Sequence, residues 1–339
     1  MQRHLAVVPS EHDVDQINRD LIAEFAMRMD VAPSTRAKYR AQLEEFRVWL
    51  AHPGGGGGRP SRLLTDADAG DVHCFMAYLR TDDRFAASMP AGSRALSASS
   101  RKSCLASLRG FFRYAVIVRL MPSDPSAGVR TPRVSHTPGL HLTVEQMHLL
   151  LNARGGARER IVTHLLAYTG ARAGELRSLQ WHDIDFRERS VTLHGKGGKV
   201  RVLALHPRLV SELRLWLVAQ ERQAERCPAI RDARASRDTD FVLLTRNGRQ
   251  LGVNAIAKQL KRRAARAGIY ALEPAHGEHR SHVSPHALRR TFATLLLNSG
   301  EPLDAIADIF GHTSVDTTRR HYAFSSAART RATIESLPL

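Results

Sequence analysis

The segment Ser284-Pro-His-Ala-Leu-Arg-Arg-Thr-Phe-Ala-Thr294 carries the pattern that decides the second half of this chain. Ser284 is a favourable N-cap and the proline after it suits the first helical turn, so a helix should begin here. His286 then falls in the first turn, and Arg289 lies on the same face three residues further on. Both side chains can reach one phosphate, which the helix N-terminus also attracts. Taken alone, the segment fits a surface helix with a capping histidine better than a phosphate site.

Two motifs lie upstream of this segment. The run Thr169-Gly-Ala-Arg-Ala-Gly-Glu-Leu176 places Arg172 at the junction between two helices, where Glu175 can brace it in an ordinary ion pair. The run Gly195-Lys-Gly-Gly-Lys199 is a glycine-rich turn between β-rich stretches and predicts a hairpin with Lys196 at its tip. A lysine there can enter a DNA groove or donate a proton, although it could also serve only solubility. Lys199 is the competing candidate.

A third motif follows the segment. Apolar residues at helical spacing over 302–310 predict a helix that Gly311 ends, which leaves His312 at the helix exit. A further helix is expected from Thr313 or Asp316, and it carries Tyr322, ten positions after the histidine. The ordinary interpretation of such a tyrosine is a half-buried aromatic residue.

Together these motifs gather two arginines, two histidines and a tyrosine, a set that suits a phosphodiester substrate. Guanidinium groups bind non-bridging phosphate oxygens, imidazoles transfer protons, and a phenol can attack phosphorus. A phenol with a pKa of about 10 is a poor nucleophile at neutral pH. A pocket with two guanidinium groups favours its ionised form, so the same charges would bind the phosphate and activate the nucleophile.

The overall charge of the chain agrees with a polyanionic partner. The 339 residues include 50 Lys and Arg against 33 Asp and Glu, a net charge of +17. Nucleic acid is the favoured partner because phosphate neutralisation releases counterions, although a basic charge alone also fits a merely soluble protein. Three separated cysteines (Cys74, Cys104 and Cys227) argue against a disulfide framework and a cysteine zinc site. With no apolar run long enough to span a bilayer, a cytoplasmic protein is expected.

Helical periodicity and proline content divide the chain into domains. A helical domain is expected over 1–125, with helices from Pro33, after Thr65-Asp-Ala-Asp68, and over 99–120. A proline-rich basic linker follows over 126–140, and a second domain occupies 141–339, beginning with a capping box at Thr143. Candidate DNA-binding residues are basic side chains of the helical faces, the linker and the hairpin, each of which could also be merely solvated: Arg36, Lys38, Arg40, Arg101, Lys102, Arg109, Arg130, Arg133 and Lys199.

The second domain is expected to mix helices with a few strands. The β-rich runs 191–194 and 200–205 should form the two arms of the hairpin, and 241–245 is expected to be one more short strand. Helices are expected over 161–168, ended by Gly170, and over 254–267. The sequence therefore predicts a mainly α chain with a small β-sheet.

The order and spacing of these motifs resemble the tyrosine recombinase family of phage integrases and Xer-like proteins. The resemblance covers about Pro33 to Tyr322 and is most specific in the second half. It implies a helical core-binding domain that clamps DNA, followed by an α+β catalytic domain. It also implies a site-specific recombinase or integrase acting on double-stranded DNA, and a homotetramer on that DNA.

The resemblance further implies a role for each motif residue. Tyr322 would attack the scissile phosphate and form a 3′-phosphotyrosyl link, while Arg172 and Arg289 hold the non-bridging oxygens. Lys196 would protonate the leaving 5′-oxygen, His286 would handle the proton of the tyrosine, and His312 would bind the phosphate. Because the covalent link conserves the bond energy, the reaction needs no ATP, metal or other cofactor.

Two features qualify this interpretation. A spacing of nine between the histidine and the tyrosine is common in the family, and His321 stands at nine, but an imidazole cannot easily replace the phenol. The histidines of 276–282 could suggest a metal site, but they lack a helical His-Glu-x-x-His arrangement. Two alternative functions are a DNA-binding regulator that lacks strand exchange and a type IB topoisomerase-like enzyme.

Overall fold

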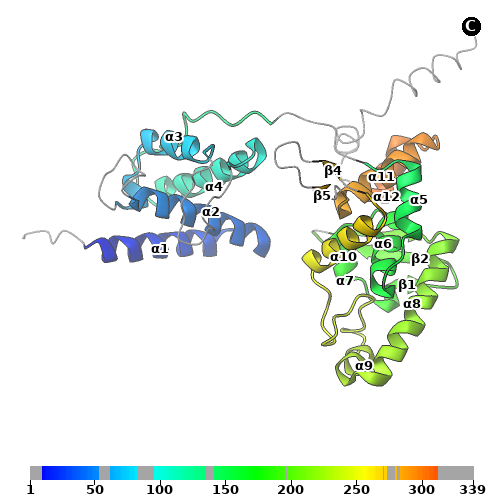
Figure 1. Ribbon diagram of the computed structural model, residues 1–339. Helices are drawn as coiled ribbons and strands as arrows, with labels where there is room; N and C mark the ends of the chain where they lie inside the picture. The colour runs from blue at the N-terminus through cyan, green and yellow to red at the C-terminus, as the bar shows by residue number, and fades with distance from the viewer. Residues whose placement is uncertain are drawn as a thin grey trace, which may run out of the picture. The chain divides into compact units, whose positions relative to one another are not determined.

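The structure is a computed structural model that describes residues 10–52, 62–81, 95–134, 141–195, 197–269 and 283–311, and the backbone of two short strands at 271–272 and 279–280. The chain forms two compact units, Met1–His136 and Thr137–Leu339 (Figure 1). No helix in the described ranges is long and apolar enough to cross a membrane.

The first unit consists of helices whose starts are set by local capping. Its described helices are α1 (Glu11–Arg28), α2 (Pro33–Ala51), α3 (Ala69–Tyr78) and α4 (Ala98–Ile117), with a 3-10 turn at Leu64–Asp66. Ser10 and Asp13 form a capping box at α1, and Asp68 and Asp71 form another at α3. The expected helices of this half are therefore present, and α1 is an additional one that the sequence analysis did not predict.

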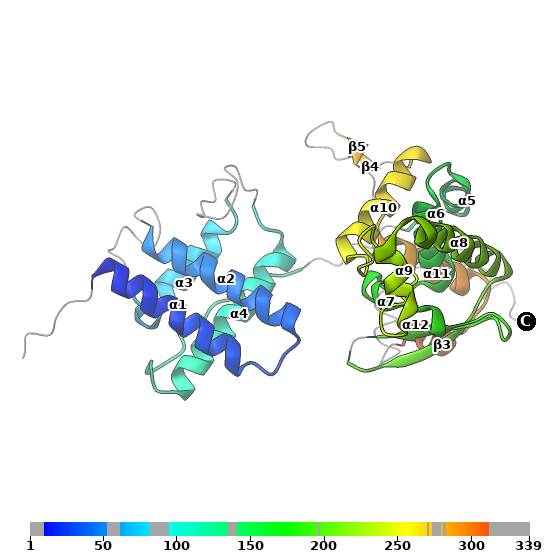
Figure 2. The same cartoon turned by 90° about the horizontal axis from the view of Figure 1, so that it is seen from below.

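Figure 2 shows helices α1 to α4 gathered in one unit, and an aromatic core holds them together. Phe46 of α2 is fully buried, and its ring centroid lies 4.9 Å from that of Phe75 in α3 and 6.1 Å from that of Phe112 in α4. Truncating such a side chain to alanine typically costs about 3–5 kcal/mol. Arg47, also buried, forms ion pairs with Asp15 of α1 and with Glu44. The two helices are thus joined by an ion pair as well as by apolar packing.

The second unit is built around α6 (Ala157–Thr169), which is buried along most of its length. Helices α8 (Pro207–Arg226), α10 (Val253–Arg266) and α11 (Pro285–Asn298) pack directly against it. The remaining described helices of this unit are α5 (Val144–Asn152), α7 (Ala173–Ser178), α9 (Pro228–Ala235) and α12 (Leu303–Phe310). Ile161, Leu165 and Leu166 are at most 1% exposed, so the apolar residues of α6 form the centre of this core.

A small antiparallel sheet covers one edge of this unit. Strands β1 (Ile184–Asp185), β2 (Ser190–His194) and β3 (Val200–Ala204) lie in that order. The register pairs Val191 with Leu203 and Leu193 with Arg201. Strands β4 (Ala271–Leu272) and β5 (His279–Arg280) form a separate pair. This architecture confirms the expected class, mainly α with a small sheet and hairpin.

One strand prediction was wrong. The run 241–245 forms no strand but makes isolated bridges, from Phe241 to Gln180 and from Leu244 to Gln250. The amide of Val242 donates to Leu179 O, whereas Leu243 O accepts from the amide of Leu251, so neighbouring residues pair with different segments. Residues 242–244 are at most 1% exposed, and the run is therefore apolar because it is buried rather than because it continues a sheet.

Candidate active site

The turn that ends α6 positions the first arginine of the site. Gly170 adopts a left-handed conformation (φ 58°), and a Cβ there would lie 2.6 Å from Phe292, so only glycine fits. The hydroxyl of Thr169 donates to Leu165 O at 2.6 Å and accepts from the amide of Ala171 at 3.1 Å. The chain is thereby reversed within three residues, and Arg172 becomes the N-cap of α7.

Glu175 fixes the position of Arg172. Its carboxylate accepts from the Arg172 amide at 2.8 Å and from Arg172 Nη1 at 3.0 Å, as the sequence analysis anticipated. The Arg172 side chain remains 41% exposed. Its Nε and Nη2 make no hydrogen bond with any residue that the structure describes, so they can bind an incoming anion.

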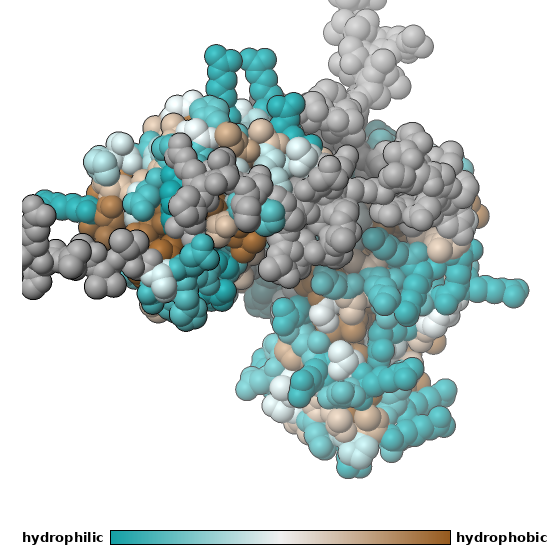
Figure 3. Space-filling view, turned by 60° about the vertical axis from the view of Figure 1, so that its left-hand side comes forward, coloured by the Kyte–Doolittle hydropathy of each residue, from teal (hydrophilic) through white to brown (hydrophobic). Residues whose placement is uncertain are grey.

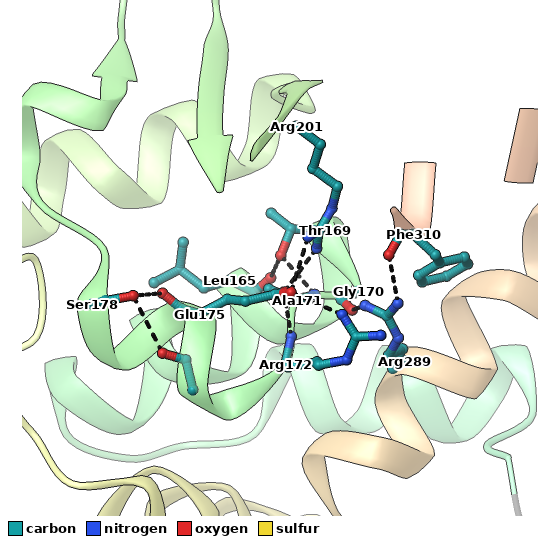
Figure 4. A network of polar contacts seen from close by, with 11 residues as sticks. Leu165, Thr169, Gly170, Ala171, Arg172, Glu175, Ser178, Arg201, Arg289 and Phe310 are labelled. Carbon is teal, nitrogen blue, oxygen red and sulfur yellow. Dashed lines mark hydrogen bonds and ion pairs between the residues drawn. The ribbon is translucent and has the colours of Figure 1, made fainter. Parts of the chain in front are cut away.

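Arg201 of β3 is a residue that the sequence analysis did not select. Its Nη1 and Nη2 donate to the two carboxylate oxygens of Glu175 at 2.9 and 2.7 Å (Figure 4). Both side chains are buried, at 9% and 4% exposure. The alternation along β3 gave a usable signal, because Arg201 shares its phase with the buried Leu203 and therefore points inward.

The charge state of Glu175 follows from these contacts. Burial alone would raise the pKa of its carboxyl, but the hydrogen bonds from Arg201 and from the Arg172 amide outweigh burial and lower the pKa to about 2. Glu175 is therefore a carboxylate at neutral pH. The buried charge of Arg201 neutralises it and leaves Arg172 as the exposed cation of the three.

Arg289 enters the same site from α11. It is 4% exposed, and its Nη1 and Nη2 donate to Gly170 O at 2.8 Å and Phe310 O at 2.9 Å. Its guanidinium also lies over the Phe310 ring, 4.2 Å from the centroid. Since Gly170 is two residues from Arg172, the fold brings together two arginines that are 117 positions apart in the sequence (Figure 4).

The N-terminus of α11 forms as the sequence predicts. The Ser284 hydroxyl accepts from the Ala287 amide at 3.1 Å, and Pro285 occupies the first turn. His286 is exposed on this first turn, while Arg289 is buried one turn further on. The histidine is therefore accessible at the surface, whereas the arginine is not.

Three of the predicted catalytic residues, Lys196, His312 and Tyr322, lie outside the described residues. The hairpin that carries Lys196 is closed by a 2.6 Å hydrogen bond from the Gly195 amide to Lys199 O. Gly311, which directly precedes His312, ends α12 in a left-handed conformation, and a Cβ there would lie 3.5 Å from Arg201. Arg201 thus lies beside the last described residue before the histidine.

The predicted DNA-binding residues divide into two groups. Three donate to backbone carbonyls of their own unit, because Arg36 binds Met29 O, Arg101 binds Leu96 O and Arg109 binds Val129 O. These three arginines therefore hold backbone segments of the first unit in place, in addition to the DNA-binding role predicted for them. The others are exposed: Lys38, Arg40, Lys102, Arg130, Arg133 and Lys199.

No cluster of three or more His, Cys, Asp or Glu side chains in the described ranges is arranged to hold a metal ion. The histidine side chains of 276–282 lie outside those ranges. The arrangement that the structure does describe is a pair of arginines beside the Gly170 turn, with the Arg172 side chain exposed and Arg289 buried.

Comparisons with known proteins agree with this arrangement. The model of the Phage integrase family matches residues 141–329. Tyrosine recombinase XerD of Mycobacterium tuberculosis (strain H37Rv) is 34% identical over 301 residues, covering 85% of this chain and 86% of the relative. Tyrosine recombinase XerC of Myxococcus xanthus is 31% identical over 295 residues, covering 86% and 87%.

Solved structures show the same fold. The XerH site-specific recombinase bound to difH substrate aligns with a TM-score of 0.63 at 19% identity, covering 97% of this chain and 85% of that one. A lambda integrase dimer bound to a COC′ core site aligns with a TM-score of 0.62 at 16% identity, covering 93% and 78%. The chain therefore belongs to the phage integrase family of tyrosine recombinases. The named relatives favour recombination over the regulator and topoisomerase alternatives.

Proposed function

We propose that this protein is a site-specific DNA recombinase that cleaves and rejoins DNA through a 3′-phosphotyrosyl intermediate. The convergence of Arg172 and Arg289 on the Gly170 turn carries this proposal. A pentacoordinate phosphorus bears more negative charge than the diester, and donors already in place stabilise that charge without reorganisation. Removing one such donor from other enzymes costs about 3–4 kcal/mol.

Tyr322 is the nucleophile in this proposal. Its phenolate attacks phosphorus, the bond to the 5′-oxygen breaks, and Lys196 supplies the proton that the leaving oxygen takes. His286 accepts the phenolic proton, and His312 donates a hydrogen bond to the phosphate. A 5′-hydroxyl of the partner strand then attacks the phosphotyrosine, restores a phosphodiester and releases the tyrosine, so that no bond energy has to be supplied from ATP.

Glu175 and Arg201 support this chemistry without contacting the phosphate. A carboxylate beside a phosphate would repel it, but Arg201 donates two hydrogen bonds to Glu175 and neutralises its charge. The same carboxylate accepts a hydrogen bond from Arg172 Nη1. The Nε and Nη2 donors of Arg172 stay without a partner among the described residues. We therefore assign Arg201 as a positioning residue for Arg172.

The first unit is proposed to clamp the DNA, and a groove in it supports this role. Arg80, Arg101, Arg130 and Arg133 line a depression of about 660 Å³ between α3, α4 and residues 128–133. Three of these arginines belong to the predicted DNA-binding set. Phosphate contacts of this kind fix position without reading sequence.

Strand exchange between two duplexes needs four cleavages, and each chain supplies one tyrosine. We therefore propose a homotetramer on the DNA as the active assembly. Analytical ultracentrifugation with and without a duplex that carries the recombination site measures this stoichiometry, and a complex with fewer than four chains at saturation contradicts it.

The decisive experiment uses Tyr322→Phe and a nicked suicide duplex. The wild-type protein should form an adduct that survives detergent, whereas the variant should bind the duplex and form none. Tyr168→Phe, a tyrosine of α6 in the same unit, is the matched control and should retain adduct formation. An adduct with Tyr322→Phe would overturn the nucleophile assignment, and a wild-type protein that binds without an adduct would indicate a regulator.

A further inference from the structure

A second basic site lies at the end of α6 opposite to the Gly170 turn. Arg158 of α6, Arg222 and Arg226 at the end of α8, and Arg246 surround a pocket of about 520 Å³. Its apolar lining includes Ala157 of α6, with Cys227 and Ile230 of the α8–α9 corner. Figure 1 shows α9 at one end of this unit and α11 at the other, and at the α9 end Figure 3 shows hydrophilic residues around smaller hydrophobic areas.

This pocket is separate from the candidate active site. Arg158 and Gly170 are 12 residues apart along α6 and its C-cap, and a rise of 1.5 Å per residue places them about 18 Å apart. None of the residues that line the pocket contributes to the network of Arg172, Glu175, Arg201 and Arg289.

The charges in the pocket are uncompensated. Elsewhere in this unit arginines pair with acids, as do Arg160 with Glu212, Arg234 with Asp240 and Arg266 with Glu159. The guanidinium groups of the four pocket arginines form no ion pair and no hydrogen bond with any described residue, and none of the described residues that line the pocket is acidic. Gathering four like charges without a counter-charge costs free energy that a bound anion would recover.

Arg158 gives the clearest sign of this imbalance. It is half-buried, and its buried Nε has no hydrogen-bond partner among the residues that the structure describes. Burial first, and then the positive charge of Arg246, lower the pKa of its guanidinium. An anion beside Arg158 and Arg246 would offset the lowering of the Arg158 pKa by the charge of Arg246.

We propose that this pocket binds a backbone phosphate of DNA, as a second contact outside the reaction site. This inference rests on the proposed function, which makes DNA the substrate. Guanidinium donors match the non-bridging oxygens of a phosphodiester, and the apolar lining lowers the local dielectric, which strengthens each hydrogen bond. At a distance of about 18 Å along α6, the pocket would hold a phosphate other than the one being cleaved.

The polar groups of the lining favour a phosphodiester over an acidic peptide. Among the described residues that line the pocket, the strongly polar side chains are the four arginines and Gln223, and of these five only the amide of Gln223 can accept a hydrogen bond. A phosphodiester only accepts hydrogen bonds and is satisfied by such a set. A peptide also brings backbone N–H groups that need acceptors.

The test measures how salt affects DNA binding by full-length protein carrying Tyr322→Phe, which prevents covalent capture. The probe is a fluorescent 60-bp duplex, and a fluorescent polyglutamate peptide tests the alternative ligand. The pocket variant replaces three exposed arginines and spares the half-buried Arg158: Arg222→Gln, Arg226→Gln and Arg246→Gln. The control variant removes the same charge from exposed positions of the same unit that line no described pocket: Arg187→Gln, Arg214→Gln and Arg237→Gln.

Each lost phosphate contact lowers the slope of log K against log salt by about 0.9. The pocket variant should lose this one phosphate contact, so between 50 and 200 mM salt the DNA affinity of the protein with the intact pocket should fall about three- to four-fold more than that of the variant. The control variant should keep the original slope. Equal changes in both variants, or none in either, would overturn the proposal, as would a loss of polyglutamate binding as large as that of DNA.

The two proposals fail in different ways. Adduct formation on the nicked duplex is measured separately with Tyr322 restored, and it should persist in the pocket variant at low salt. An absent adduct in the protein with an intact pocket refutes the recombinase mechanism, whatever the salt slopes are. Matching thermal unfolding curves confirm that each variant folds.

Discussion

Replacing Glu175 by glutamine removes the carboxylate that joins Arg172 to Arg201, and it tests whether that charge stabilises the fold. The pKa of this carboxyl is about 2 in the folded protein against an ordinary 4.5. Because the folded-state pKa is depressed, the stabilisation is fully present above about pH 4.5 and is lost as the pH falls through 2.

The magnitude follows from the difference between the two pKa values. Subtracting 2 from 4.5 gives about 2.5 pH units, or about 3 kcal/mol at neutral pH. Because the side chain of Glu175 is only 4% exposed, solvent screening reduces this value little. Between pH 5 and pH 3 the titration should remove about 2 kcal/mol of the stabilisation.

Urea unfolding followed by tryptophan fluorescence measures this loss. Trp181 and Trp216 report on the second unit, so a Trp49→Phe background removes the signal of the first unit. Between pH 5 and pH 3, the protein with Glu175 should lose about 2 kcal/mol more unfolding free energy than Glu175→Gln. Glu188→Gln, at a carboxylate that is 73% exposed, is the control and should leave the pH dependence unchanged. Parallel curves with and without Glu175 would refute the argument.

Three further changes address the turn and the helix that hold the arginines. Arg289→Lys should lower adduct formation about 10²–10³-fold, because one ammonium cannot replace the planar fork that reaches two carbonyls, and an unchanged rate would count against a phosphate-binding role. Gly170→Ala should cost about 2–4 kcal/mol of unfolding free energy because its Cβ would meet Phe310 at 2.7 Å. Gly174→Ala, with open space around its Cβ, should not destabilise the protein, and equal costs at the two glycines would contradict the steric argument. Ser284→Ala should cost about 1 kcal/mol through the lost cap, measured by thermal unfolding, whereas Ser284→Thr should retain most of it.

Much of the fold could be predicted from local signals because the residues that set helix ends act over a few positions. Thr143 caps α5 with Gln146, and Ser284 caps α11, as their side-chain types indicate. Gly170 and Gly311 end helices in left-handed conformations that other residues adopt only with strain. The hairpin also followed from two β-rich runs around glycines, two of which have positive φ.

Other parts could not be predicted because they depend on pairing between distant segments. The role of Arg201 follows from a bidentate pair with Glu175, 26 positions earlier, that only the tertiary fold creates. The run 241–245 has strand-like composition, yet its partners are single residues of two different segments. The arginine pocket could not be predicted for the same reason, because its four arginine side chains come from three separate stretches of the chain.

The contacts of Arg289 explain why its two roles must be measured separately. It joins the end of α6 to the end of α12 through the carbonyls of Gly170 and Phe310, while the resemblance assigns it to the phosphate. Losing this arginine therefore removes two buried hydrogen bonds to these carbonyls, at about 1–3 kcal/mol each, in addition to any catalytic effect. Among the described residues, Glu175 holds the guanidinium of Arg172 through one nitrogen, Nη1, and the Arg172 side chain is 41% exposed. Substitutions there should lower adduct formation with much less loss of stability, so the ratio of the two effects distinguishes an arginine that binds substrate from one that also holds the site together.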